Sequence, residues 1–210
     1  MIVTISRMFG SGGSDVAARI ARQLGWSLLD NAMVDAVAER LGVSPAEVSQ
    51  REERIPSLVE RIANAMRMTT PEFVASIEDV PITDTAEMRL VDVTNRVIEE
   101  AVQQGDAVLV GRGAQCMLAD RPDALHVFCY AAKPALVAYA IAHRGLDPAT
   151  AQHEVERRNK QREQYVKRNF GRDWRLFENY HLCLDTGRLG IETAADIVVA
   201  AARKRFNLSA

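Results

Sequence analysis

The first thirty residues constrain the fold of this chain more than any other stretch. Residues 2–5 form a β-branched run, Ile-Val-Thr-Ile, that is typical of a buried strand, and residues 16–24 carry apolar side chains at helical spacing. Between them lies a run, residues 6–15, with three glycines in four positions. A strand, a glycine-rich turn and a helix predict a phosphate cradle, because the amides of the turn and the positive end of the helix dipole face one ligand.

The glycine-rich run matches one known phosphate-binding motif in part. The P-loop reads G-x-x-x-x-G-K-[ST], with the lysine on the phosphates and the hydroxyl on the magnesium ion. Aligned on Gly12, the chain supplies Ser14 for the metal-binding hydroxyl. Arg7 stands where the motif has its first glycine, and Gly13 stands where it has its lysine. The loop therefore has the layout of a P-loop without its ammonium group.

Two alternative interpretations of the loop stay open. The dinucleotide motif reads G-x-G-x-x-G and is followed about twenty positions later by an acidic residue. Gly10, Gly12 and Asp30 satisfy part of that pattern, while Asp15 occupies the third glycine. The other alternative is a tight turn between strand and helix that binds nothing, although three closely spaced glycines are more than a bare turn requires.

Composition and apolar patterning argue against several classes of partner. The chain of 210 residues is long enough to bury the core of a single domain, 1–210. Its net charge of -2 gives no indication of nucleic acid or an anionic membrane as a partner, and no apolar run is long enough to span a bilayer. Three widely separated cysteines in apolar surroundings predict buried free thiols and a cytoplasmic protein. They are Cys116, Cys129 and Cys183.

Short apolar runs alternate with amphipathic segments along most of the chain. Such alternation predicts a parallel sheet covered by helices on both faces. A helical insertion, residues 31–105, interrupts the alternation, and its pattern suits acceptor-binding helices, a homodimer surface or a plain helical ornament. The expected strands are residues 2–5, 26–29, 107–110, 124–130 and 182–184, and the expected helices outside the insertion are residues 16–24, 134–143 and 193–205.

Glycines and polar residues follow several of the expected strands at the point where each strand ends. Gly10 to Ser14 follow the first strand, Asp30 the second, Gly111 to Gly113 the third and Asp185 the fifth. Ligands of parallel sheets bind beyond the carboxyl ends of the strands. We therefore expect these residues to line one site at one edge of the sheet.

A second informative stretch is rich in arginine. In a helix over residues 154–169, Arg158, Arg162 and Tyr165 lie on one face, with Arg168 close to it. Guanidinium groups suit phosphate oxygens, and phosphoryl transfer needs positive charge and exclusion of water. The stretch therefore fits a lid over phosphates. The alternative is a solvated helix in which interspersed glutamates pair with the arginines.

These segments together resemble a known family. The opening, residues 2–31, looks like that of bacterial cytidylate kinases, and it is closer still to the group usually called cytidylate-kinase-like, in which glycine also replaces the P-loop lysine. The similarity continues in residues 110–113, 158–174 and 179–190. It covers nearly the whole chain, and residues 56–85 are the part without a motif that can be placed.

The resemblance implies a P-loop kinase, with a three-layer α/β fold and a five-stranded parallel sheet of order 2-3-1-4-5. It implies ATP and Mg²⁺ as cofactors, acceptor-binding helices within residues 31–105 and a helical lid over residues 147–178. Asp30 would lie at the metal or the acceptor, Arg112 would hold an acceptor phosphate, and Asp185 would lie beside the substrate. The residues implied to contact ATP are Gly10, Ser11, Gly12, Gly13 and Ser14, with Ser14 also at the metal. The residues implied to act in transfer are Arg7, Asp30, Arg158, Arg162 and Arg168.

The chain also departs from true cytidylate kinases. Gly13 removes the lysine, so Arg7 or a lid arginine would have to supply its charge. Val110 and Gly113 stand where those enzymes carry acidic residues, and residues 135–138 lack the arginine that is usual after the fourth strand. CMP or dCMP is therefore one candidate acceptor among several.

Three functional hypotheses follow, with structural alternatives for single residues. The first is an ATP- and Mg²⁺-dependent small-molecule kinase, the second a catalytically weak nucleotide-binding regulator, and the third, more remote, a dinucleotide-dependent oxidoreductase. The structural alternative for Asp30 is that it caps a following helix. The structural alternative for Arg112 is a bridge to a carboxylate such as Asp185.

Overall fold

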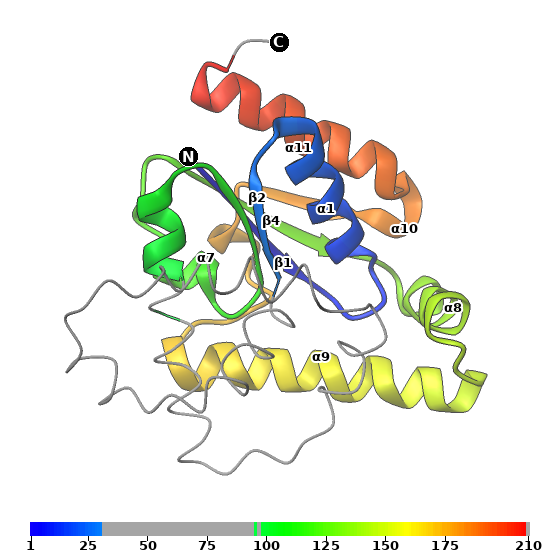
Figure 1. Cartoon of the computed structure of the whole chain (residues 1–210). Coiled ribbons are helices and arrows are strands. Elements are labelled where there is room, and N and C mark those ends of the chain that lie inside the picture. The colour runs from blue at the N-terminus through cyan, green and yellow to red at the C-terminus, as the bar shows by residue number, and fades with distance from the viewer. Residues whose placement is uncertain (31–94, 96–97, 209–210) are drawn as a thin grey trace, which may run out of the picture. The chain divides into compact units, whose positions relative to one another are not determined.

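A five-stranded parallel sheet organises the structure, and its central strand is the first in the chain. The structure is a computed structural model that describes residues 1–30, 95 and 98–208 (Figure 1). The strand order is β2-β3-β1-β4-β5, which confirms the predicted order. The strands are β1 (Ile2–Arg7), β2 (Ser27–Asp30), β3 (Ala107–Val110), β4 (Ala124–Tyr130) and β5 (Leu182–Asp185).

The chain divides into two compact units. One comprises Met1–Leu28 and Ala107–Ala210, and the other is Leu29–Asp106. Most of the second unit lies outside the described residues, and so do most of the predicted insertion and the dimer surface expected on it. The glycine-rich loop and the arginine-rich helix both belong to the first unit.

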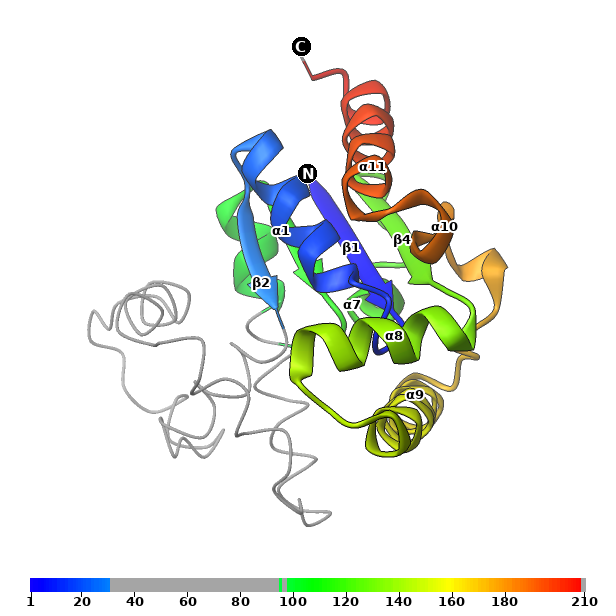
Figure 2. The same cartoon turned by 90° about the vertical axis from the view of Figure 1, so that its right-hand side faces the viewer.

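Helices cover the sheet and its carboxyl edge. In one core cluster, alternate residues of β1, β3 and β4 pack against α1 and α11, with Val16 and Ile20 of α1 fully buried. Each such side chain contributes roughly 1.5–3 kcal/mol through burial. In Figure 2 the arrowheads of β1 and β4 point toward α8 and α9. The helices are α1 (Gly13–Leu24), α7 (Ala114–Met117), α8 (Lys133–Arg144), α9 (Pro148–Phe170), α10 (Thr186–Leu189) and α11 (Ile191–Phe206).

Local signals explain where α9 begins and ends. Asp147 is its N-cap, and the carboxylate accepts hydrogen bonds from the amides of Ala149 and Thr150 at 3.0 and 3.1 Å. Pro148 occupies the first turn, where its missing N–H leaves no donor unpaired. Gly171 ends the helix in the left-handed conformation. The helix therefore forms one continuous rod that includes the whole arginine-rich stretch.

Two features differ from the sequence-based expectations. Two one-turn helices were not predicted: α10 follows β5 directly, and α7 follows β3 after the turn at residues 111–113. A helix of four residues is too short to show an apolar period in the sequence. Cys129 is buried as expected, but Cys116 is half-buried and Cys183 is exposed. Cys183 lies on β5, an edge strand of the sheet, which explains its exposure. Of the helices in the described part of the chain, none is both long and apolar enough to cross a membrane.

Candidate active site

The loop between β1 and α1 takes a shape that requires glycine. Gly10 and Gly12 have φ angles of 83° and 67°, in the left-handed region that side chains disfavour. A Cβ atom on Gly10 would lie 2.4 Å from the carbonyl oxygen of Leu136 in α8. One on Gly12 would lie 2.9 Å from the side chain of Ile191. Backbone conformation and close packing therefore both exclude larger residues here.

The amides of the loop fall into two groups. Met8 donates to the carbonyl of Cys129 at 2.9 Å, Phe9 to the side chain of Asn159 at 2.7 Å, and Ser11 to the carbonyl of Met8 at 3.2 Å. The second group donates no hydrogen bond within the part of the chain that the structure describes. It consists of the amides of Gly10, Gly12, Gly13 and Ser14. Unpaired amides at the first turn of a helix, where the dipole is positive, suit a phosphate group.

The residues at the two departures from the P-loop motif lie against each other. A Cβ atom on Gly13 would lie 2.4 Å from the Cβ of Arg7 and 3.2 Å from that of Cys129. The Arg7 side chain is 8% exposed and fills this space. Positions 7 and 13 therefore share one site at the base of the loop, and only one of them has room for a side chain. In the motif the cationic side chain, a lysine, stands at the end of the loop, whereas in this chain a cationic side chain, Arg7, stands at its beginning.

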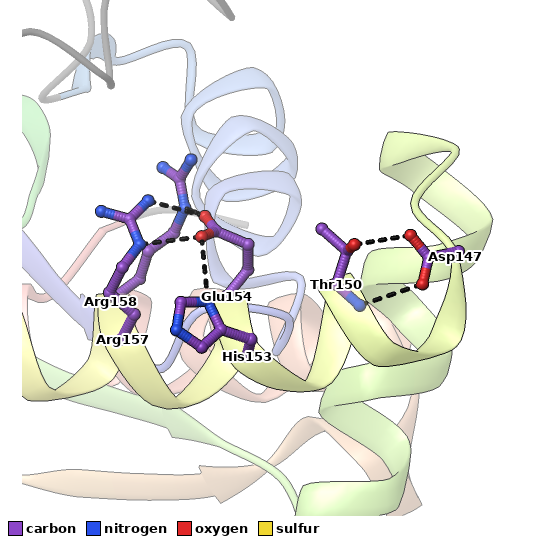
Figure 3. A network of polar contacts seen from close by, with 6 residues as sticks. All are labelled: Asp147, Thr150, His153, Glu154, Arg157 and Arg158. Atoms are coloured by element: carbon purple, nitrogen blue, oxygen red, sulfur yellow. Dashed lines mark hydrogen bonds and ion pairs between the residues drawn. The ribbon is translucent and has the colours of Figure 1, made fainter.

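The arginines of α9 lie partly in a cluster of charges and partly on the loop. Glu154 accepts hydrogen bonds from Arg157 and Arg158 at 2.7–2.8 Å (Figure 3). The bond from Arg157 is the main cause of a lowered pKa of Glu154. The Arg158 guanidinium also lies over the ring of Phe9, 4.9 Å from its centroid, and burial lowers the pKa of this arginine. The predicted glutamate pairs therefore exist, but the paired Arg158 remains at the loop.

Arg162 contacts the loop more directly, and Arg168 lies further along the helix. The Arg162 guanidinium donates a hydrogen bond to the backbone carbonyl of Arg7 at 3.0 Å and lies 5.9 Å from the centroid of the Phe9 ring. Arg168 is an exposed residue near the end of α9. Of the three predicted lid arginines, the structure therefore brings Arg158 and Arg162 to the loop.

The turn after β3 holds Arg112 in a strained conformation. Gly111, Arg112 and Gly113 have φ angles of 74°, 48° and 72°, so three successive residues are left-handed. For arginine this conformation costs roughly 1–2 kcal/mol, and such strain is typical of functional sites. The Arg112 guanidinium lies 5.5 Å from the centroid of the Tyr165 ring of α9. A Cβ atom on Gly113 would lie 2.0 Å from the ring of Phe170.

Asp185 has a local role that the sequence does not reveal. It is the N-cap of α10, and its carboxylate accepts a hydrogen bond from the amide of Arg188 at 3.2 Å and pairs with the Arg188 side chain at 3.6 Å. Its charged partner is therefore Arg188 and not the Arg112 considered above. The adjacent Thr186 was missed by sequence reasoning. Its hydroxyl group donates a hydrogen bond to the backbone carbonyl of Ser11, with 2.6 Å between the two oxygen atoms.

The remaining predicted positions have simpler surroundings. Ser14 is exposed in the first turn of α1, and its own amide is the last of the group described above. Magnesium in kinase sites is held by phosphate oxygens and one or two protein groups, and the Ser14 hydroxyl fits that requirement. Asp30 is the last residue of β2 and is half-buried. Within the described ranges, no group of three or more His, Cys, Asp or Glu side chains forms a metal site.

Comparisons with known proteins agree with this geometry. A sequence profile described as "Cytidylate kinase-like family" matches residues 2–188, whereas a search of curated proteins found no match. An uncharacterized protein from Eubacterium ventriosum has a similar structure, with a TM-score of 0.67 at 21% identity over 96% of this chain and 98% of that chain.

Two further solved structures share the fold more distantly. TT1252 from Thermus thermophilus gives a TM-score of 0.54 at 18% identity, over 100% of this chain and 98% of that chain. A gluconokinase from Sinorhizobium meliloti gives 0.51 at 13% identity, over 99% and 97%. At these identities the likeness concerns the fold alone.

Proposed function

We propose that this chain, which belongs to the cytidylate kinase-like family, transfers the terminal phosphoryl group of ATP to a small-molecule acceptor. The observation that carries the proposal is the group of unpaired amides at Gly10, Gly12, Gly13 and Ser14, next to the guanidinium groups of α9. Phosphoryl transfer needs little covalent chemistry from the protein. It depends on positioning and on stabilisation of charge, which these groups supply.

The positions of the donor-side residues support a proposed role for each. The loop amides hold the phosphates of ATP, and the Ser14 hydroxyl provides one ligand for Mg²⁺, which supplies charge neutralisation when bound. Arg7 provides the cation that the motif's lysine would otherwise supply, because its side chain occupies the space next to Gly13. Arg158 and Arg162 cover the transferred group and exclude water, and Arg168 joins them from the last turn of α9.

For the acceptor side we propose Arg112, Asp30 and Asp185, the residues that the family resemblance implies. Arg112 is the strongest of these candidates, because a strained backbone and the Tyr165 ring hold its guanidinium at the sheet edge. A guanidinium suits a phosphate or carboxylate of the acceptor. We propose a nucleotide-like acceptor such as CMP or dCMP. Asp30, at the end of β2, and Asp185, at the end of β5, are proposed to contact the acceptor or the metal.

One observation favours a second candidate function. Arg7 is only 8% exposed, so its guanidinium has less freedom to follow a moving phosphoryl group than an exposed lysine would. A nucleotide-binding regulator with weak transfer is the alternative that this favours. A dinucleotide-dependent oxidoreductase gives the arginines of α9 no role.

An assay of ADP production separates these functions. The protein is mixed with Mg²⁺ and ATP and with nucleoside monophosphates, nucleosides and sugar acids in turn, and ATP binding is measured by calorimetry. Turnover with one acceptor class supports the kinase. Binding of ATP without turnover on any acceptor supports the regulator, and absence of ATP binding contradicts both. The Ser14→Ala variant is the control, because it should lose Mg²⁺-dependent turnover while its fold is unchanged.

A further inference from the structure

One amide of the phosphate loop is bound by a side chain from a distant helix. The Oδ1 atom of Asn159, in the middle of α9, accepts the hydrogen bond of the Phe9 amide at 2.7 Å, across 150 positions of the sequence. Asn159 is 2% exposed. It lies on the buried stripe of α9, four residues after Val155 and seven before Val166. A polar side chain on such a stripe needs a partner, and the loop provides it.

Two further contacts connect the same part of α9 to the same part of the loop. Arg162, less than one turn after Asn159, donates to the Arg7 carbonyl at 3.0 Å. The Arg158 guanidinium lies over the Phe9 ring at 4.9 Å, and Phe9 shares a core cluster with Val155. Backbone and side chain of the loop at residues 7–9 are therefore both held by residues 155–162 of α9, which form about two turns of the helix.

Other elements hold the remainder of the loop. The Thr186 hydroxyl donates toward the Ser11 carbonyl, and Gly10 packs on the backbone of Leu136. A segment with three glycines has many conformations when it is free, so its ordering is unfavourable unless contacts offset the lost entropy. Contacts that order such a segment before ligand binding increase affinity by preorganisation.

We infer that Asn159 is a positioning residue, which holds the phosphate loop in its ligand-binding shape by accepting the Phe9 hydrogen bond. The inference predicts that the middle of α9 is docked on the loop whether or not nucleotide is bound, in contrast to a helix that reaches the loop only on closure. The link to affinity rests on the proposed ATP-binding function, whereas the docking itself does not.

Amide hydrogen exchange of the ligand-free protein tests the docking directly. The Phe9 amide should exchange slowly, and the Met8 amide is a matched control because its acceptor is the Cys129 carbonyl and not α9. In Asn159→Leu, which has similar size and no acceptor, exchange at Phe9 should accelerate roughly ten- to hundredfold while Met8 stays protected. Asn159→Asp retains the acceptor oxygen and should restore protection at Phe9.

Binding of the unreactive analogue AMPPNP with Mg²⁺ gives the second measurement. Asn159→Leu should weaken binding roughly tenfold and raise the KM for ATP more than it lowers kcat. An unprotected Phe9 amide in the natural protein would overturn the inference even if no variant folds, and so would unchanged protection and affinity in Asn159→Leu. Absence of turnover in the natural protein would contradict the kinase proposal alone, because the exchange result needs no turnover.

Discussion

The loops after β1 and β3 share an edge of the sheet but present different chemistry. In the loop after β1, each described left-handed residue is a glycine, the chain is held by several elements, and backbone amides are left for a ligand. In the turn after β3, a left-handed position is occupied by Arg112, and a side chain is presented instead. The same backbone conformation at the end of a strand therefore has two uses. In the loop after β1 it leaves main-chain amides for a ligand, and in the turn after β3 it presents a side chain.

The largest effect is expected where the first loop has no space. Gly10→Ala adds a Cβ that meets the Leu136 carbonyl oxygen and forces alanine into the left-handed region, so the free energy of unfolding should fall by about 2–5 kcal/mol. Gly25→Ala is the matched control, since Gly25 is also left-handed but has open space around it. It should lose only about 1–2 kcal/mol. Equal losses in urea unfolding would contradict a tight loop.

Exchange of Arg7 and Gly13 tests whether the first loop depends on this buried cation. Arg7→Ala should lower kcat by about a hundredfold or more, as loss of one transition-state donor does. Gly13→Lys alone should also have a lower kcat, because the new side chain collides with that of Arg7. The double variant Arg7→Gly/Gly13→Lys recreates the P-loop pattern and should recover most of the lost rate. A double variant as slow as Arg7→Ala would show that the two positions are not equivalent.

Lowering the pH should destabilise the sheet that carries both loops. His126 on β4 is hydrogen-bonded to Thr4 of β1 at 2.8 Å, and burial, with a smaller effect of His181, lowers the pKa of His126 to about 4. The folded state therefore binds this proton less well than the unfolded state. The stabilisation that the neutral His126 imidazole provides is present above the pKa of this group in the unfolded state, near 6.5, and is lost as the pH falls toward 4.

The free energy of unfolding should consequently fall by about 2 kcal/mol between pH 7 and pH 4.5. Urea unfolding across this range measures the change. His126→Gln removes the titrating group, so the pH dependence should become shallower, although His181, whose pKa burial also lowers, adds a contribution in the same direction. A variant with the same slope as the natural protein would assign the effect to other groups.

The smallest effect on stability, and one of opposite sign, is expected in the second loop. Arg112→Gly removes the side chain from a left-handed position and should stabilise the fold by roughly 1 kcal/mol. The same change should raise the KM for the acceptor by roughly tenfold or more, because a charge-assisted bond is lost. ATP affinity should be unaffected. Loss of stability together with an unchanged KM for the acceptor would show that Arg112 is not part of the acceptor site.

Sequence alone predicted much of the first unit, because its signals are local. The strand and helix around the glycine-rich loop follow from apolar spacing, and the sheet order came from the family resemblance. The contact between Asn159 and Phe9 was not predicted, since no local pattern connects residues 150 positions apart. A signal existed nonetheless, because Asn159 lies on the apolar stripe of α9 with Val155 and Val166.

The finer chemistry of the site was less accessible from the sequence. The sequence left open whether Arg7 or a lid arginine replaces the lysine. The structure adds that a Cβ on Gly13 would lie 2.4 Å from the Cβ of Arg7, which supports the proposal of Arg7 but does not test its role. The capping role of Asp185 depends on α10, a helix of one turn, which produces no periodic pattern. The functional roles of all the predicted site residues, Asp30 and Arg168 included, remain predictions.

The shared space at positions 7 and 13 restricts how such a loop evolves. Between a loop with glycine at position 7 and lysine at position 13 and the loop seen here, a change that introduces arginine first would create two overlapping side chains, whereas one that removes lysine first would leave two glycines without a collision. The route without overlap therefore runs through glycine at both positions. The two substitutions are coupled, because reversion of Gly13 to lysine alone would make the side chains overlap again.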